Sequence, residues 1–151
     1  MVLIDRILSH TNLFIRLHKL PSMVRHYHSQ KIPAVYNEEE IPKHERSGGA
    51  TQWYFRGFET LMGITNIYPG SHEEVHSHPW EQIVYVLEGS CRFFVDDELK
   101  LLESGDILVI PPEIEHGIED HDEYGKLLFT GPLREDMSRL TDYQEEFVTY
   151  E

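Results

Sequence analysis

The sequence predicts an all-β fold, a sandwich or barrel of short antiparallel strands, and three observations support this. From residue 31 onward the apolar stretches are short and rich in β-branched and aromatic residues. Gly, Pro, Asp and Asn separate them at close, regular intervals. The stretches follow one another without intervening helical periodicity, which is typical of β-sandwiches and barrels.

Seven strands are expected, in chain order, at residues 51–56, 60–68, 81–87, 90–96, 98–102, 106–111 and 124–130. Residues that favour turns lie between them, at 66–70, 88–90, 96–97, 104–106 and 111–112. Successive side chains of a strand point to opposite faces. In the third strand, therefore, Gln82, Val84 and Val86 share one face, and Ile83, Tyr85 and Leu87 share the other.

The distribution of charge divides the chain. Residues 1–30 have a formal charge of +3, whereas the other 121 residues have −17. We therefore expect an N-terminal extension at 1–30, one main domain at 31–134, and an acidic C-terminal arm or short helix at 135–151.

The first 22 residues mix Leu, Ile and Phe with Arg and His and contain almost no acid. Three interpretations remain open. The segment is a helix docked on the domain, an upstream extension with Met23 as the working start, or an organelle transit peptide, although it is poorer in Ser than most transit peptides. We expect a cytoplasmic protein, with organelle targeting by residues 1–22 as the alternative.

Composition excludes several classes of function. The net charge of −14 argues against nucleic-acid binding, which depends on clustered Lys and Arg. The chain contains no run of 18 apolar residues, so the sequence predicts no membrane span. Cys91 is the single cysteine, so the chain has no internal disulfide and no cysteine-based metal site. It lies in an alternating apolar run, which favours a buried core thiol.

Four side chains are candidate metal ligands. In an extended segment His76 and His78 point to the same side, so both imidazoles can reach one ion. Gln82 has the same parity at the start of a strand, although Pro79 interrupts regular pairing. His116 follows an apolar strand and a Pro-Pro turn. Spacing alone leaves two interpretations open, a metal site or a pair of surface histidines on a loop.

Two longer motifs resemble those of the cupin family. Residues 70–89 resemble its first motif, with Gly70, His76, His78, Gln82 in the usual glutamate position, and Gly89. Residues 105–116 resemble its second motif, with Gly105, Pro111, Glu113 where glycine is usual, and His116. The resemblance covers roughly residues 31–134. It implies a double-stranded β-helix (jelly-roll) barrel that holds one divalent ion through His76, His78, Gln82 and His116.

The chain departs from the family pattern in ways that bear on the site. Gln82 replaces a glutamate, Glu113 replaces a turn glycine, and Asp120 stands where asparagine is usual. A one-residue bulge would present Glu81 to the metal in place of Gln82; without the bulge Glu81 faces the other way.

The implied ligand set, three imidazoles and an amide oxygen, is neutral, so the site would keep the full +2 charge of its ion. Such a site attracts anionic substrates and enolates. Nitrogen and oxygen donors suit Fe, Mn, Zn, Ni, Co or Cu, and affinity alone does not select among them.

We expect an enzyme that acts on a small carbonyl or carboxylate compound by metal-assisted ring opening, isomerisation or lyase chemistry. A metal-dependent dioxygenase and a non-catalytic small-molecule-binding module are the alternatives. The neutral glutamine favours the non-redox form. So does the run at 131–136, which resembles the ending of cupins similar to a pectin-degradation protein that acts on unsaturated uronates. Glu81 and Tyr85 are the candidate acid and base, and Arg56 is the candidate clamp for a substrate carboxylate.

The parity of the strands also predicts the pocket lining. Apolar walls are expected from Val84, Val86, Phe93 and Val95, and aromatic residues at the mouth from Trp53, Phe55, Tyr68 and Trp80. The expected partner is a small-molecule substrate, not nucleic acid or a membrane. A homodimer formed through sheet faces and the apolar segment 31–60 is also expected.

Overall fold

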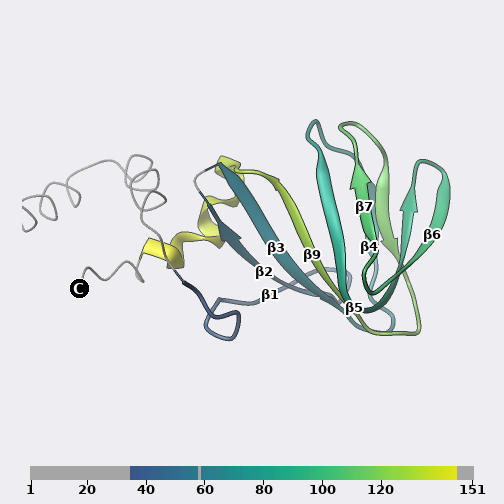
Figure 1. Cartoon of the computed structure of the whole chain (residues 1–151), viewed down its shortest axis with the longest axis horizontal. Coiled ribbons are helices and arrows are strands. Elements are labelled where there is room, and N and C mark those ends of the chain that lie inside the picture. Colours follow the sequence, from purple (N-terminus) through teal and green to yellow (C-terminus); the bar gives the residue numbers. More distant parts are fainter. Residues whose placement is uncertain (1–34, 58, 146–151) are drawn as a thin grey trace, which may run out of the picture. The chain divides into compact units, whose positions relative to one another are not determined.

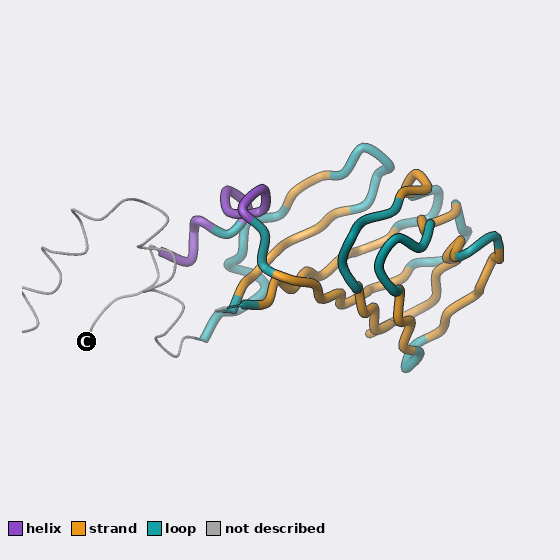
Figure 2. The backbone as a smooth tube through the Cα atoms, turned by 90° about the horizontal axis from the view of Figure 1, so that it is seen from above, coloured by secondary structure: helices purple, strands orange, loops and turns teal. Residues whose placement is uncertain are grey.

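The computed structural model describes residues 35–57 and 59–145. Within these ranges the chain forms strands, followed by two short 3₁₀ helices after the last strand (Figures 1 and 2). The elements are β1 (His44–Glu45), β2 (Thr51–Arg56), β3 (Thr60–Ile67), β4 (Glu73–His76), β5 (Gln82–Val95), β6 (Glu98–Glu103), β7 (Ile107–Ile110), β8 (His116–Glu119), β9 (Gly125–Pro132), η1 (Glu135–Leu140) and η2 (Asp142–Glu145). The expected extension at 1–30 lies outside the described residues.

All strand pairs are antiparallel and join into one curled sheet. The order is β1-β2-β3-β9-β5-β8-β4, with β6 and β7 also paired to β5. The start of β5 lies between β7 and β9, and its end lies between β6 and β8. The all-β jelly-roll prediction is confirmed. None of the helices among these residues has the length and apolar character needed to cross a membrane.

β5 is the element that turns the sheet back on itself. The sequence predicted two strands separated by a turn at 88–90, and this was wrong, because one strand of 14 residues runs through that point. The register shifts between Val86 and Glu88, as at a β-bulge. Gly89 has a φ of +67°, and a Cβ there would lie 1.9 Å from the carbonyl oxygen of Tyr124. Glycine therefore lets the strand bend instead of ending it.

The other strand predictions were right where the strand has an apolar pattern and missed the strands that lack one. β2 matches its predicted range, and β3, β6, β7 and β9 end within two residues of theirs. The two-residue β1 and the four-residue β4 and β8 were not predicted. β4 reads Glu-Glu-Val-His, which has no alternating apolar pattern, and its side chains are mostly exposed. β4 and β8 nevertheless pair with each other, and both carry candidate ligands.

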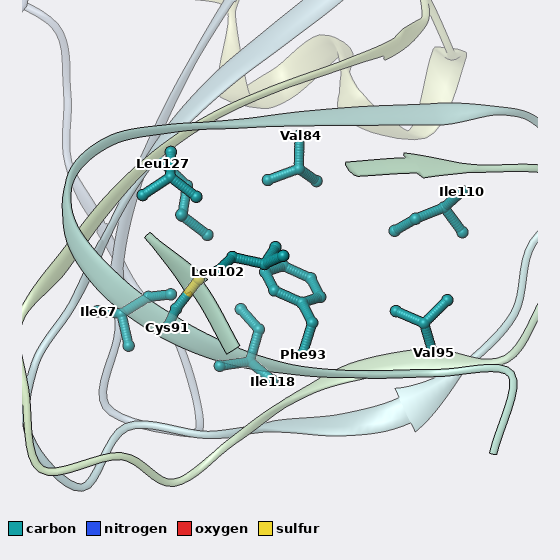
Figure 3. Close-up of a cluster of buried hydrophobic side chains, with 10 residues drawn as sticks. Ile67, Val84, Cys91, Phe93, Val95, Leu102, Ile110, Ile118 and Leu127 are labelled. Atoms are coloured by element: carbon teal, nitrogen blue, oxygen red, sulfur yellow. The ribbon is translucent and has the colours of Figure 1, made fainter. Parts of the chain in front are cut away.

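The main core fills the space enclosed by the bent sheet. Ten buried residues from six strands form it, and Figure 3 shows their side chains converging from opposite ribbons. They are Ile67, Val84, Val86, Cys91, Phe93, Val95, Leu102, Ile110, Ile118 and Leu127. Burying each large aliphatic or aromatic side chain contributes about 1.5–3 kcal/mol, so this interior fixes the positions of the strands that carry the site.

A second cluster covers the opposite face of β2 and β3. Trp53 and Ile64 face each other across these strands and pack with Ile41. Tyr36 and Tyr143 contribute from outside the sheet. β2 is therefore buried on both faces, which places Trp53 away from the main core.

Candidate metal centre

Strand pairing brings the candidate histidines together. His76 is the last residue of β4, His116 is the first residue of β8, and the two are direct cross-strand partners. His78 follows β4 in the loop that leads to β5. Residues that are 40 positions apart in sequence therefore occupy adjacent positions in the fold.

The three imidazoles are close enough to share one ion. One ring nitrogen from each of His76, His78 and His116 lies within 4.8 Å of the others. The ring centroids are 4.5 Å apart for His76 and His116, and 4.7 Å apart for His78 and His116. Neutral imidazole nitrogens at this spacing can coordinate a divalent transition metal.

Backbone hydrogen bonds fix the orientation of all three rings in the same way. Each Nδ1 lies 2.8–2.9 Å from a carbonyl oxygen, which can only accept, so each Nδ1 carries the proton. The acceptors are Glu74 for His76, Trp80 for His78 and Ile114 for His116. The Nε2 lone pair is left free in each ring. Fixing the tautomer through the other nitrogen is the usual arrangement around protein-bound metals.

The environment of His116 indicates what these free nitrogens would bind. Its side chain is 1% exposed, and Nε2 is buried without a hydrogen-bond partner among the described residues. Burial lowers the pKa of His116 below its usual value, and the nearby His76 and His78 lower it further. A buried, unpaired, neutral nitrogen is costly unless it meets a partner, and a cation supplies one.

Gln82 presents a fourth donor. Its Oε1 lies 3.1 Å from Nε2 of His78. Because His78 carries its proton on Nδ1, its Nε2 is an acceptor, and Gln82 places an amide oxygen, also an acceptor, opposite it. Two lone pairs at this distance suit two ligands of one ion. The donor set therefore fits a divalent metal.

The turn before His116 is tied to the loop that carries His78. The backbone amide of Glu113 donates a hydrogen bond of 2.8 Å to the carbonyl oxygen of His78. Glu113 has a φ of +67°, in the left-handed region that favours glycine. The chain keeps the glycine conformation with a glutamate, and that conformation connects the two ligand-bearing segments.

Next to the imidazoles lies a cavity of about 280 Å³. His76, His78 and Gln82 line it on the side of the ligands. Apolar residues make up much of the remaining wall, including Val84, Phe93, Ile118, Leu127 and Phe129. Cavities of this size take small ligands.

Charged and aromatic groups lie along the same cavity. The indole of Trp80 stacks on His78 with centroids 4.4 Å apart and planes 9° apart. The guanidinium of Arg134 lies 4.1 Å above Trp80, and its Nε bonds Asp136 at 3.2 Å. Arg46 also lines the cavity, 4.0 Å from Glu73. Two guanidinium groups and one carboxylate therefore face this space.

The wall formed by β2 and β3 carries a hydrogen-bonded polar row. Nε2 of Gln52 donates to Oγ1 of Thr65 at 3.0 Å, and the hydroxyl of Tyr54 donates to Oε1 of Gln52. All three residues line the cavity. Burial raises the pKa of Tyr54, so its hydroxyl stays protonated at neutral pH.

The predicted catalytic residues lie elsewhere. Glu81 and Tyr85 are exposed, and Arg56 is buried at 5% exposure, but none of them lines the cavity. Glu81 borders a separate hollow with Trp80 and Ile83. Their catalytic roles stay predictions without support from the site geometry.

Sequence reasoning missed Gln52, Tyr54, Arg46 and Arg134 as cavity residues. The run at 131–136 was a signal for Arg134. No comparable signal existed for Tyr54, because both faces of β2 carry buried aromatic side chains. Among the expected lining residues, Val84, Phe93 and Trp80 do line the cavity.

Comparisons with known proteins agree with the fold and the motifs. The Cupin domain family model matches residues 63–130. Protein SchB of Streptomyces halstedii is 31% identical over 63% of this chain and 75% of its own length. Polyketide synthase CurC of Streptomyces cyaneus is 30% identical over 64% of this chain and 68% of its own length.

Solved structures of similar fold include an RmlC-like cupin from Shewanella frigidimarina, with a TM-score of 0.63 and 27% identity. That match covers 70% of this chain and 96% of the other. The polyketide cyclase RemF from Streptomyces resistomycificus has a TM-score of 0.61 at 18% identity, over 76% of this chain and 98% of its own. The matched family, the relatives and the curled antiparallel sheet agree: this chain belongs to the cupin family.

Proposed function

We propose that this cupin is a metal-dependent enzyme that converts a small carbonyl compound without net oxidation. One divalent transition metal would be held by His76, His78, Gln82 and His116. The observation that carries the proposal is the common orientation of the three imidazoles. Each is held through Nδ1 by a backbone carbonyl, and the buried Nε2 of His116 has no partner among the described residues.

A metal bound by these neutral ligands would polarise a carbonyl oxygen as a Lewis acid. The chain's own groups would orient the substrate. The stack of Arg134 on Trp80 and of Trp80 on His78 fixes one side of the cavity. Val84 and Phe93 supply apolar surface that excludes water from the reacting group.

Two arginines on the cavity lining support an anionic substrate. The chain as a whole carries −14, yet Arg46 and Arg134 outnumber the one carboxylate on the lining, that of Glu73. Guanidinium groups recognise carboxylates and enolates through charge-assisted hydrogen bonds. Both guanidinium groups have carboxylate neighbours, Arg46 near Glu73 and Arg134 near Asp136, so the preference for a carboxylate or an enolate rests on their place on the cavity lining and not on an excess of positive charge.

The comparisons support a substrate that carries several carbonyl groups. One relative is named a polyketide synthase, and one structure of the same fold is a polyketide cyclase. Poly-β-ketone chains are rich in enolisable carbonyls and become anionic when they enolise. We therefore propose cyclisation or isomerisation of an acidic β-dicarbonyl compound as the reaction class.

Metal reconstitution tests the site. Metal-free protein would be dialysed separately against Zn²⁺, Mn²⁺, Fe²⁺, Ni²⁺, Co²⁺ and Cu²⁺ and then analysed for metal content. We expect one equivalent in the wild type and a loss of at least about tenfold in affinity for His76→Asn and His116→Asn. His121→Asn is the matched control, because His121 bonds Ser90 and does not line the cavity. Protein that stays metal-free under all six conditions would overturn the proposal.

The reaction class needs a separate experiment. Loaded protein would be incubated with 3,5-dioxohexanoate under argon, and the products followed by NMR. We expect metal-dependent conversion without oxygen. In parallel, an oxygen electrode would measure whether the loaded protein consumes oxygen with acetylacetone or catechol. Oxygen uptake by the wild type that disappears in His76→Asn would contradict this proposal and indicate a dioxygenase.

A further inference from the structure

The polar row on β2 and β3 is not needed to hold a metal, yet it faces the same cavity. Gln52 and Thr65 are cross-strand partners, so their side chains lie side by side on one face of the sheet. Tyr54 is two residues from Gln52 on β2 and shares its face. The row therefore results from strand register and does not depend on a loop.

The ring of Tyr54 is held in place from several sides. Phe129 contacts it edge-on, with centroids 5.9 Å apart and planes 77° apart. Phe129 can lie there because residue 63 is glycine, and a Cβ at that position would come within 2.2 Å of its ring. Tyr54 is 3% exposed. The side chain is therefore fixed in position, and Tyr54 lines the cavity.

The hydrogen-bond directions determine what that hydroxyl offers. The amide nitrogen of Gln52 is engaged by Thr65, so the amide oxygen faces Tyr54 and takes the tyrosine proton. The phenolic oxygen keeps lone-pair capacity that Gln52 does not use. Since burial raises the pKa of Tyr54, the group stays neutral, and it accepts hydrogen bonds as a phenol and not as a phenolate.

We propose that Tyr54 accepts a hydrogen bond from a hydroxyl group of the substrate, an enol or a phenol, and so selects substrates that carry a free hydroxyl besides the donor atoms held at the histidines. This inference rests on the proposed function and narrows its substrate class. Gln52 and Thr65 are positioning residues, because they fix the direction of the Tyr54 proton. Sites built to pair with a substrate hydroxyl discriminate strongly against analogues that lack it.

The test compares the binding of aromatic ketones that carry one hydroxyl group with that of ketones that carry two. 2′-Hydroxyacetophenone can chelate a metal through its carbonyl and phenolate oxygens. The 2′,3′-, 2′,4′- and 2′,5′-dihydroxy isomers add a second hydroxyl at different positions. Binding to Co²⁺-loaded protein would be measured through the visible absorption of the cobalt. We expect at least one dihydroxy isomer to bind about tenfold more tightly than the monohydroxy compound.

Tyr54→Phe keeps the ring and deletes the hydroxyl. We expect it to retain the wild-type cobalt content and to lose the tenfold preference for the dihydroxy isomer over 2′-hydroxyacetophenone. Thr65→Val, which frees the Gln52 amide to turn, should weaken the preference while Tyr54 is intact. Tyr124→Phe is the matched control, since its hydroxyl bonds Asn66 and its side chain does not line the cavity.

The outcomes separate the two proposals. Failure of the wild type to take up cobalt, or to bind 2′-hydroxyacetophenone, would count against the metal site itself. A wild type that binds the monohydroxy compound but shows no preference for any dihydroxy isomer would overturn the role of Tyr54. So would a preference that survives in Tyr54→Phe.

Discussion

The amide nitrogen of Glu113 lies 2.8 Å from the carbonyl oxygen of His78, and this hydrogen bond joins the turn before β8 to the loop before β5. Glu113, which donates this bond, has a left-handed conformation with φ of +67°. A side chain with a Cβ pays about 1 kcal/mol for that conformation, whereas glycine adopts it freely. The ligand-bearing loops are therefore held together at a residue that carries backbone strain.

We predict that Glu113→Gly stabilises the protein. Removing the strain should outweigh the entropy that glycine adds to the unfolded chain, which leaves a net gain of about 0.5 kcal/mol and a rise in Tm of about 1–2 °C. Differential scanning calorimetry of metal-free protein measures it. Glu115→Gly is the control, since Glu115 lacks a positive φ, and it should lower Tm. A fall in both variants would contradict the role given to residue 113.

Gln82→Glu should tighten metal binding. A carboxylate in place of the amide oxygen 3.1 Å from His78 Nε2 would add a negative charge beside the ion. We expect the affinity for Zn²⁺ to rise at least about tenfold in a competition titration with a chromogenic chelator. Glu81→Gln serves as the control. Unchanged affinity in Gln82→Glu together with a loss in Glu81→Gln would show that Glu81 is the ligand, as a bulge at that position would require.

The four candidate ligands differ in how far the sequence could predict that they lie close together. His76, His78 and Gln82 are separated by even numbers of residues, so in an extended segment they point to the same side. The sequence alone therefore indicated that they lie close together. The meeting of His76 with His116 depends on the pairing of β4 with β8, two four-residue strands without an apolar pattern. Only the family motifs connected these residues in advance.

The opposite wall of the cavity was not predictable in the same way. β2 is buried on both faces, with Trp53 and Tyr54 at 1% and 3% exposure. Alternation of apolar and polar side chains therefore could not tell which face meets the cavity. The expected turn at Glu88 failed for a related reason, because Gly89 marks a bulge in a continuous strand as readily as a turn between two strands.

Stability of the metal-free protein should depend on pH through His116. Burial lowers the pKa of His116 in the folded protein, so the unfolded chain binds the proton more readily. The contribution of the neutral side chain is complete above a pH of about 6.5. It decreases as the pH falls below that value, toward the folded pKa. Urea unfolding at several pH values should show this slope, and His116→Asn should flatten it. Equal slopes in both proteins would contradict the assignment to His116.

Cys91 should be unreactive while the protein is folded. The thiol is fully buried in the main core, and burial raises its pKa to about 12 (Figure 3). Iodoacetamide reacts with thiolates, so at pH 8 we expect alkylation only after unfolding in guanidinium. Mass spectrometry at timed intervals would measure it, with Ser104→Cys as an exposed thiol for comparison. Rapid alkylation of native wild-type protein would show that this core opens.

The outer face of the sheet leads to a prediction about assembly. One register row crosses five strands through Trp53, Ile64, Leu128, Tyr85 and Ile107, and all five residues are apolar or aromatic. At the β2 end the row is covered by the second cluster, whereas Tyr85 is 39% exposed and Ile107 66% exposed at the other end. An apolar face that continues from a covered region into solvent is typical of a surface that meets another protein.

We therefore predict a homodimer that buries the β5 and β7 end of this face. Because a two-fold interface places the same surface on both partners, one charge introduced at its centre appears twice and lies unpaired against apolar side chains. Sedimentation at micromolar concentration should show a dimer for the wild type and a monomer for Ile107→Lys. Leu99→Lys is the control, since Leu99 is exposed to a similar degree, at 51%, but lies on β6. A monomeric wild type would refute the dimer. Dissociation by Leu99→Lys and not by Ile107→Lys would show that the interface lies on the part of the sheet that contains β6.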